Sequence, residues 1–166
     1  MYTVTKTYGA ERGLSAAFRQ WRAKSHCRYI HGYALAITLR FGAAELNEQN
    51  WVIDFGDLGA VKSFLERTFD HTLCVASDDP DLDQLASLAG LDLADVRVFP
   101  HGVGCEKFAE YVFGWVSDWL SDAGHAPRVR LLEVEVREHS GNAASVEVKP
   151  CHYNGINVNI KTHDQD

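Results

Sequence analysis

Apolar and polar residues alternate with a period of two along residues 28–41, which predicts the longest strand of the chain. The apolar members of one face are Leu35, Ile37, Leu39 and Phe41. Side chains two apart in a strand share a face, so His31 and Tyr33 lie in line with that apolar row. Such polar groups are either hydrogen-bonded within a core or line a pocket.

Three further stretches have strand character. Residues 2–8 are rich in β-branched and aromatic side chains, and alternation returns over residues 129–138. In the latter strand Leu132, Val134 and Val136 mark the expected core face, and Glu138 ends that row where a pocket could lie. Residues 145–149 follow a Ser-Gly-Asn turn and are expected to form its hairpin partner.

Two segments show helical spacing of apolar residues, 57–69 and 105–124. The acidic segment 78–96 is less regular and is interpreted as a loop with a short helix. The predicted order is therefore β-β-α-(α)-α-β-β. This order favours an α+β fold with helices packed on one face of an antiparallel sheet.

Length and composition narrow the class of protein. The 166 residues suit one domain over residues 1–150, and 151–166 are expected to add an edge strand or a frayed tail. A formal charge of −7 argues against a general nucleic-acid surface. The four cysteines form no C-x-x-C pair, and neither a signal peptide nor a membrane span is recognised. We expect a cytoplasmic protein with free thiols that binds neither nucleic acid nor a membrane.

Polar residues of chemical interest gather in three places. The first group is His26, Cys27, His31 and Tyr33; the second is Asp70 and His71; the third is Gly102, Gly104, Cys105, Glu106 and Glu138. Each has a structural alternative. A histidine or cysteine can be a buried core residue, Asp70 can cap a helix or turn, and Glu106 can complement a helix dipole.

Six segments in this order resemble the family of 6-pyruvoyltetrahydropterin synthase and 6-carboxytetrahydropterin synthase. They are SAAFRQW (15–21), CRYIHGY (27–33), WVIDFGDL (51–58), FDHTL (69–73), GCEKFAEYVFGW (104–115) and EVEVREHSGNAASVEV (133–148). The resemblance implies the tunnelling fold, in which a four-stranded antiparallel sheet carries two main helices. It also implies a homo-oligomeric barrel, as a hexamer or tetramer, with active sites at subunit interfaces.

The resemblance implies a lyase that acts on 7,8-dihydroneopterin triphosphate. In the bacterial carboxy branch the products are 6-carboxytetrahydropterin, acetaldehyde and triphosphate, on the route to deazaguanine nucleosides such as queuosine. By position, Cys27 matches the general base, Asp70 and His71 match a proton-relay pair, and Glu138 matches the carboxylate that anchors the pterin. Cys105 and Glu106 match a turn that also meets the pterin, and Tyr33 is expected to contact the substrate.

The zinc ligands of the family are only partly matched. Three imidazoles hold the metal in the family, whereas the corresponding positions here are Phe18, His31 and Tyr33. Three alternatives follow: loss of zinc with His31 and Tyr33 polarising the substrate, a rebuilt site, or a catalytically inactive pterin-binding relative. The rebuilt site would combine His31 with His26, Cys27, His71 or His152. A different reaction on a related pterin or purine is a further alternative.

Overall fold

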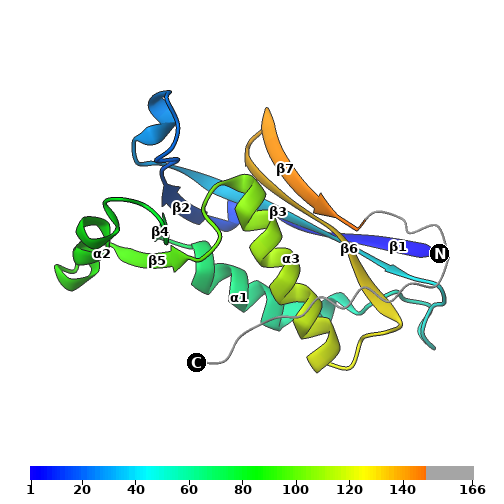
Figure 1. Ribbon diagram of the computed structural model, residues 1–166. Coiled ribbons are helices and arrows are strands. Elements are labelled where there is room, and N and C mark those ends of the chain that lie inside the picture. Colours follow the sequence, from blue (N-terminus) through cyan, green and yellow to red (C-terminus); the bar gives the residue numbers. More distant parts are fainter. Residues whose placement is uncertain (149–166) are drawn as a thin grey trace.

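Strand β3 (His31–Ala43) is a central strand of the sheet, and antiparallel strands pair along both of its edges (Figure 1). The computed structural model describes residues 1–148. β1 (Tyr2–Tyr8) and β2 (Leu14–Phe18) follow one another along the same edge of β3. β6 (Val129–His139) occupies the other edge, and β7 (Asn142–Glu147) completes a hairpin with β6. This confirms the predicted α+β class and the antiparallel pairing around β3, but the sheet has seven strands and not the four that were expected.

Two parallel strands extend this sheet beyond β2. β4 (Thr72–Ala76) pairs with β2, and β5 (Asp95–Phe99) pairs with β4, giving the order β5-β4-β2-β3-β6-β7. The short helix α2 (Leu82–Gly90) connects them, within the segment expected to hold one. All five residues of β4 are buried, so the strand shows no alternation. The period-two criterion therefore could not detect it.

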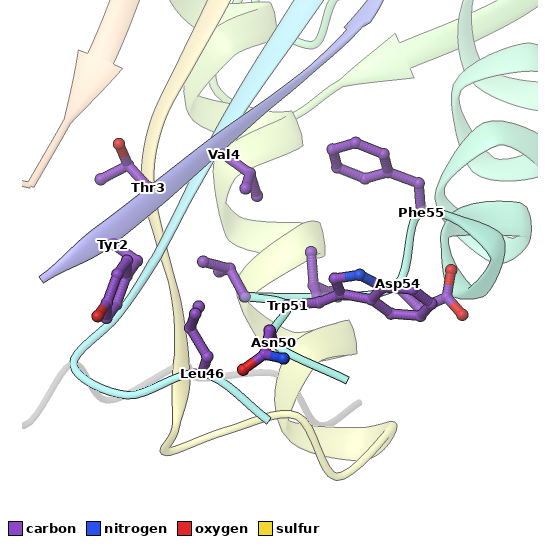
Figure 2. Close-up of a pocket in the computed structure, with 10 residues that line it drawn as sticks. Tyr2, Thr3, Val4, Leu46, Asn50, Trp51, Asp54 and Phe55 are labelled. Carbon is purple, nitrogen blue, oxygen red and sulfur yellow. The ribbon is translucent and has the colours of Figure 1, made fainter. Parts of the chain in front are cut away.

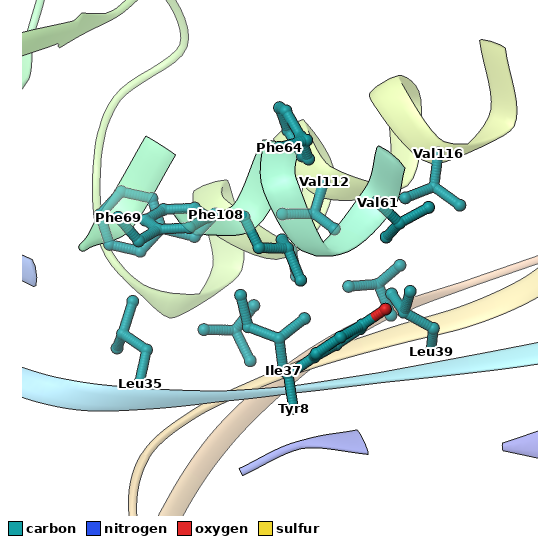
Figure 3. Packing of buried hydrophobic residues seen from close by; sticks show 14 of the residues in the cluster. Tyr8, Leu35, Ile37, Leu39, Val61, Phe64, Phe69, Phe108, Val112 and Val116 are labelled. Atoms are coloured by element: carbon teal, nitrogen blue, oxygen red, sulfur yellow. The ribbon is translucent and has the colours of Figure 1, made fainter. Parts of the chain in front are cut away.

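Helices α1 (Gly59–Phe69) and α3 (Cys105–Asp122) lie on one face of the sheet, as predicted (Figure 1). Figure 3 shows Val61 and Phe64 of α1 and Val112 of α3 above the apolar row of β3. That row is fully buried, which confirms the face predicted for it. Phe64 and Trp115 stack with ring centroids 3.9 Å apart and join the two helices.

The structure corrects two details of the strand predictions. The strand predicted over 28–41 begins at His31, because residues His26–Arg28 form a short 3₁₀ helix. In β6, the register shifts so that Arg40 pairs with Glu133 and Phe41 pairs with Leu131. The intervening Leu132 therefore leaves the core face and packs over Gly42. A Cβ atom added to residue 42 would lie only 2.6 Å from Leu132 Cδ1, so glycine suits this position.

Farther along β6, Val134 and Val136 are buried as predicted. A second register shift lies between Arg137 and His139, so Glu138 has no directly paired residue in β7. β7 begins at Asn142, earlier than expected, because residues 140 and 141 make a tight turn between His139 and Asn142. The predicted extension 151–166 lies outside the described residues. Within residues 1–148, no helix has the length and apolar character to span a membrane.

Candidate active site

A cavity of about 390 Å³ opens where the start of β3, the start of α3 and the β6–β7 turn converge. It is lined by Phe18, Gln20, Cys27, His31, Tyr33, Gly104, Cys105, Glu106, Glu138, Gly141, Asn142, Ala143 and Ala144. The structure thus brings together Cys27, Tyr33, Cys105, Glu106 and Glu138, with His31 among them. These side chains come from segments more than 100 residues apart in sequence.

Three aromatic side chains form one wall of this cavity. Phe18 lies directly opposite His31 in the β2–β3 ladder, and Tyr33 is two residues along the same face. The ring centroids of Phe18 and His31 are 5.0 Å apart, those of His31 and Tyr33 5.7 Å, and those of Phe18 and Tyr33 6.2 Å. Phe18 is only 2% exposed and also packs edge-on against Phe108 of α3. The three positions that the resemblance matches to zinc ligands are therefore adjacent in space.

A hydrogen bond to the backbone fixes the tautomer of His31. Its Nδ1 lies 2.7 Å from the carbonyl oxygen of Tyr29. A carbonyl oxygen can only accept, so Nδ1 carries the proton when the ring is neutral, and Nε2 is left as an acceptor. His31 can therefore accept a proton or a hydrogen bond from a ligand through Nε2.

Cys27 lies in the 3₁₀ helix that precedes β3. Ser25 caps this helix by accepting a hydrogen bond from the Cys27 backbone amide at 3.4 Å. The carbonyl of Cys27 accepts a hydrogen bond from the backbone amide of Gln20 at 2.9 Å. The thiol is partly exposed, as a base that acts on a bound ligand must be.

Glu138 is a partly buried carboxylate without a Lys or Arg partner in the described part of the chain. Its side chain is 19% exposed, and its only ion-pair neighbour there is His139, with Nε2 3.6 Å from Oε1. Asn142 Nδ2 donates a hydrogen bond to Oε1 at 2.7 Å. Oε2 lies 4.0 Å from Cys105 Sγ. Such a carboxylate retains capacity to accept charge-assisted hydrogen bonds from a ligand.

Cys105 opens α3 and is buried, whereas Cys27 is partly exposed. Burial, and then the negative charges of Glu138 and Glu106, raise the pKa of the Cys105 thiol to about 11. Cys105 therefore stays protonated at neutral pH and can act only as a weak donor. Gly104 before it has φ of 105°, a conformation that favours glycine, and Glu106 occupies the first turn of the helix.

Tyr33 is held as a neutral phenol. Desolvation, followed by the nearby Glu138, Cys27 and Cys105, raises the pKa of its hydroxyl. The hydroxyl therefore remains a hydrogen-bond donor to a ligand in the cavity.

Asp70 and His71 do not line this cavity within one chain. They lie between α1 and β4, and Asp70 Oδ1 accepts a hydrogen bond from His71 Nδ1 at 2.6 Å. The His71 side chain is 85% exposed, and its backbone has φ of 54°, which is uncommon for a residue other than glycine. The two side chains do face each other, and the neutral ring keeps Nε2 as an acceptor at the surface.

The donor set does not fit the zinc site of the family. Phe18 has no ligand atom, and a neutral phenol such as Tyr33 is a poor zinc ligand. Within residues 1–148, no group of three or more His, Cys, Asp or Glu side chains is arranged to hold a metal ion. A rebuilt site around His31 is thus not formed by the described residues of one chain, and His152 lies outside them.

A second cavity, of about 420 Å³, lies beside the first residues of β1 (Figure 2). Tyr2 and Val4 line it together with Leu46, Trp51 and Phe55 from the loop after β3. The larger volume does not make it the better active-site candidate. None of the residues predicted to act in chemistry lines it, and Asp54 is its single ionisable carboxylate.

Two residues of the candidate active site were not singled out from the sequence. Gln20 lies in one of the segments that resemble the family, and the sequence marks Asn142 only as a turn residue. Gln20 donates a hydrogen bond to Val103, which is 83 residues away in sequence, and Asn142 donates one to Glu138 across the β6–β7 turn. No spacing rule reports such contacts, but the position of Asn142 at a turn directly after Glu138 was a usable signal.

Comparisons with known proteins show the family and the fold. The family model of 6-pyruvoyl tetrahydropterin synthase matches residues 8–149. A 6-carboxy-5,6,7,8-tetrahydropterin synthase from Rickettsia bellii is 27% identical over 62 residues, which span 37% of this chain and 45% of that relative. The matched stretch therefore covers less than half of the relative.

Solved structures share the fold. An uncharacterized protein from Wolinella succinogenes has a TM-score of 0.75 at 19% identity, covering 89% of this chain and 98% of the other. The 6-pyruvoyl tetrahydropterin synthase of Plasmodium falciparum has a TM-score of 0.63 at 15% identity, covering 87% and 96%. The tunnelling fold is confirmed, whereas the oligomeric barrel stays a prediction. Because the family model spans most of the sequence, the chain belongs to the 6-pyruvoyl tetrahydropterin synthase family.

Proposed function

We propose that the protein is a lyase of the 6-carboxytetrahydropterin synthase type, acting on 7,8-dihydroneopterin triphosphate. With one water, this substrate would yield 6-carboxytetrahydropterin, acetaldehyde and triphosphate, a step toward deazaguanine nucleosides such as queuosine. The observation that carries the proposal is the gathering of Cys27, Tyr33 and Glu138 around one cavity of about 390 Å³. That volume lies within the usual range for small-molecule sites.

Glu138 would recognise the pterin. The pyrimidine edge of a pterin presents adjacent N–H donors, in a geometry that matches the two oxygens of a carboxylate. Glu138 has no Lys or Arg partner among residues 1–148, so its charge is available to such an edge. Glu106 and the Cys105 thiol would contribute to the same recognition from the start of α3.

Cys27 would act as the general base on the side chain at C6. Its thiol lies on the same cavity as Glu138, so a pterin anchored by Glu138 would present its side chain toward Cys27. Proton transfer by a well-placed side chain contributes about 10²- to 10⁴-fold to a rate. In a homo-oligomer with interfacial sites, the exposed Asp70–His71 pair of a neighbouring copy would complete the proton relay.

His31 and Tyr33 would take over the polarisation of the substrate that zinc provides elsewhere in the family. Tyr33 supplies a hydroxyl donor, and His31 supplies an acceptor at Nε2. These groups can orient hydroxyls of the C6 side chain and exchange protons with them. The proposal therefore assigns no step to a metal.

The test is release of triphosphate from 7,8-dihydroneopterin triphosphate by the purified full-length protein. We expect release that persists after treatment with EDTA and stops in Cys27→Ala, while binding of 7,8-dihydroneopterin is retained. Normal turnover by Cys27→Ala would show that the role of Cys27 is wrong. Loss of activity with EDTA, restored by zinc, would overturn the metal-free assignment.

One observation favours a second candidate function, a catalytically inactive pterin-binding protein. Phe18 fills a ligand position with a buried ring, which is compatible with binding and contributes nothing to chemistry. Binding of 7,8-dihydroneopterin with no triphosphate release, with or without added zinc, would favour this alternative over the lyase.

A further inference from the structure

Gln20 bridges the two halves of the candidate active site. Its backbone amide donates a hydrogen bond to the carbonyl of Cys27 at 2.9 Å. Its side-chain Nε2 donates to the carbonyl of Val103 at 2.8 Å, two residues before Cys105 at the start of α3. One residue thus connects the segment that carries the proposed base to the turn that opens α3.

The segment that carries Cys27 has few other anchors near the thiol. The remaining backbone hydrogen bonds of residues 20–29 join Ala23 to Gln20, Arg28 to Ser25 and Tyr29 to His26, so each is local. Residues 26, 27 and 28 bury no side chain. Among the described residues, the bond from the Gln20 amide is therefore the one backbone hydrogen bond that joins Cys27 to a residue outside its own 3₁₀ helix.

Ion pairs of Arg19 and Arg22 hold the first residues of this segment, and none of their side chains lines the cavity. Arg19 Nε donates to Asp79 Oδ2 at 2.8 Å, and Arg19 also pairs with Asp81 at 2.7 Å. Arg22 pairs with Asp78. These contacts fix the ends of residues 19–22 against the loop after β4, and they leave the alignment with α3 to Gln20.

The backbone at Gly104 is shaped around the Gln20 amide. A Cβ atom at residue 104 would lie 2.1 Å from Gln20 Nε2, closer than any real contact. Gly104 also has φ of 105°, so two independent features suit glycine at this position. The close approach allows the Gln20 amide to reach the Val103 carbonyl.

We infer that Gln20 is a positioning residue that sets the placement of Cys27 relative to Cys105 and Glu106. This inference rests on the proposed function, because it assumes that Cys27 acts on a ligand anchored from the α3 side. Gln20 acts through the Cys27 carbonyl and not on the reacting atoms. A misplacement of about 1 Å between reacting groups can lower a rate by about 10²-fold, so the link affects turnover more than binding.

The test compares Gln20→Leu and Gln20→Glu with the wild-type protein. Leucine keeps the approximate size but removes the donor, and glutamate replaces the donor with an acceptor that faces the Val103 carbonyl. We expect kcat for triphosphate release to fall about 10- to 100-fold. The Kd of 7,8-dihydroneopterin, followed by fluorescence, is expected to stay unchanged within error.

A second readout does not depend on turnover. Alkylation of Cys27 by iodoacetamide, resolved by mass spectrometry, is expected to be several-fold faster in Gln20→Leu because the loosened segment opens more often. Gln84→Leu on the exposed face of α2 is the matched control and should behave as wild type. Should Gln20→Leu fail to fold, Gln20→Asn, which keeps the amide but shortens its reach, gives the same two readouts.

The outcomes separate the inference from the proposed function. Unchanged alkylation and unchanged kcat in both variants would overturn the positioning role. A Kd that weakens as much as kcat/KM falls, with kcat preserved, would also overturn it and make Gln20 a ligand contact. If the wild-type protein releases no triphosphate, the proposed function fails, and the alkylation rates alone then decide whether Gln20 positions Cys27.

Discussion

Asn142 Nδ2 donates a hydrogen bond to Glu138 Oε1 at 2.7 Å across the β6–β7 turn. The bond orients the carboxylate at the edge of the cavity and satisfies one lone pair of Oε1. Oε2 lies 4.0 Å from the protonated Cys105 thiol and has no stronger donor among the described residues. The carboxylate is therefore prealigned, with capacity left for a ligand that brings its own donors.

Glu138→Gln is expected to weaken pterin binding strongly. Hydrogen bonds to a charged group contribute about 1.5 to 3 kcal/mol, so the Kd of 7,8-dihydroneopterin should rise about 10- to 100-fold. The amide also presents a donor where the ligand presents donors. Fluorescence titration measures the Kd, and Glu147→Gln on the exposed face of β7 is the control. Equal Kd values for Glu138→Gln and the wild type would remove Glu138 from pterin recognition.

Asn142→Asp is expected to make pterin binding depend on pH. The introduced carboxylate would lie against Glu138 in place of a donor, and the like charges raise the pKa of the pair. At lower pH the pair shares a proton, which restores a donor–acceptor contact similar to that of the amide. The loss of affinity relative to wild type should be larger at about pH 8 than at about pH 5.5. A penalty that is the same at both values would show that Asn142 does not act through the Glu138 carboxylate.

Prediction from sequence succeeded where one face of a strand is buried and the other is not. The row of β3 that ends in Phe41 alternates cleanly, so the face that carries His31 and Tyr33 could be assigned. The same rule failed for β4, whose residues are buried on both faces. It also misplaced Leu132, because one extra residue in β6 changes which side chains face the core.

The candidate site shows a similar division. Cys27, Cys105 and Glu138 could be named because they lie in segments that resemble a family, and the structure brings them to one cavity. The contacts of Gln20 and Asn142 depend on the approach of loops from different elements, which no local pattern encodes. Asp70 and His71 resemble the family equally well, yet both lie outside the cavity of their own chain, which a match of sequence segments does not reveal.

Alkaline pH is expected to destabilise the fold through buried thiols. Burial raises the pKa of Cys74 from its ordinary value of 9.0 to about 12, and that of Cys105 to about 11. Above pH 9 the unfolded chain loses these protons while the folded chain keeps them, so stability falls as pH rises toward 12. Urea unfolding midpoints should therefore decrease between about pH 8 and about pH 11.

Cys74→Val tests the source of this alkaline loss. Valine suits a buried strand position and removes one titrating group, so the decrease in the urea midpoint should be shallower than in wild type. The decrease that remains would come from Cys105 and from Tyr8. Burial raises the pKa of the Tyr8 hydroxyl to about 12. An equally steep decrease in Cys74→Val would mean that the Cys74 thiol does not contribute.

The aromatic wall of the cavity predicts that a zinc site can be restored by two substitutions. Phe18, His31 and Tyr33 are neighbours on one face, with ring centroids between 5.0 and 6.2 Å apart. Phe18→His combined with Tyr33→His would place three imidazoles there, a ligand set that suits zinc. We expect about one zinc per chain and a higher Tm on addition of zinc, because binding to the folded state alone stabilises it. The wild-type protein should show neither effect.

Phe18→His combined with Tyr33→Phe is the matched control, because it disturbs the same two positions and supplies only two imidazoles. Both double variants should lose about 2 kcal/mol of stability without metal, since a buried ring is replaced by a smaller polar one. Only the three-imidazole variant should regain stability with zinc, measured by thermal unfolding and by metal analysis. Stoichiometric zinc in the wild-type protein would contradict the assignment of a pocket without metal. That assignment follows because no three His, Cys, Asp or Glu side chains among the described residues of one chain are arranged to hold a metal ion.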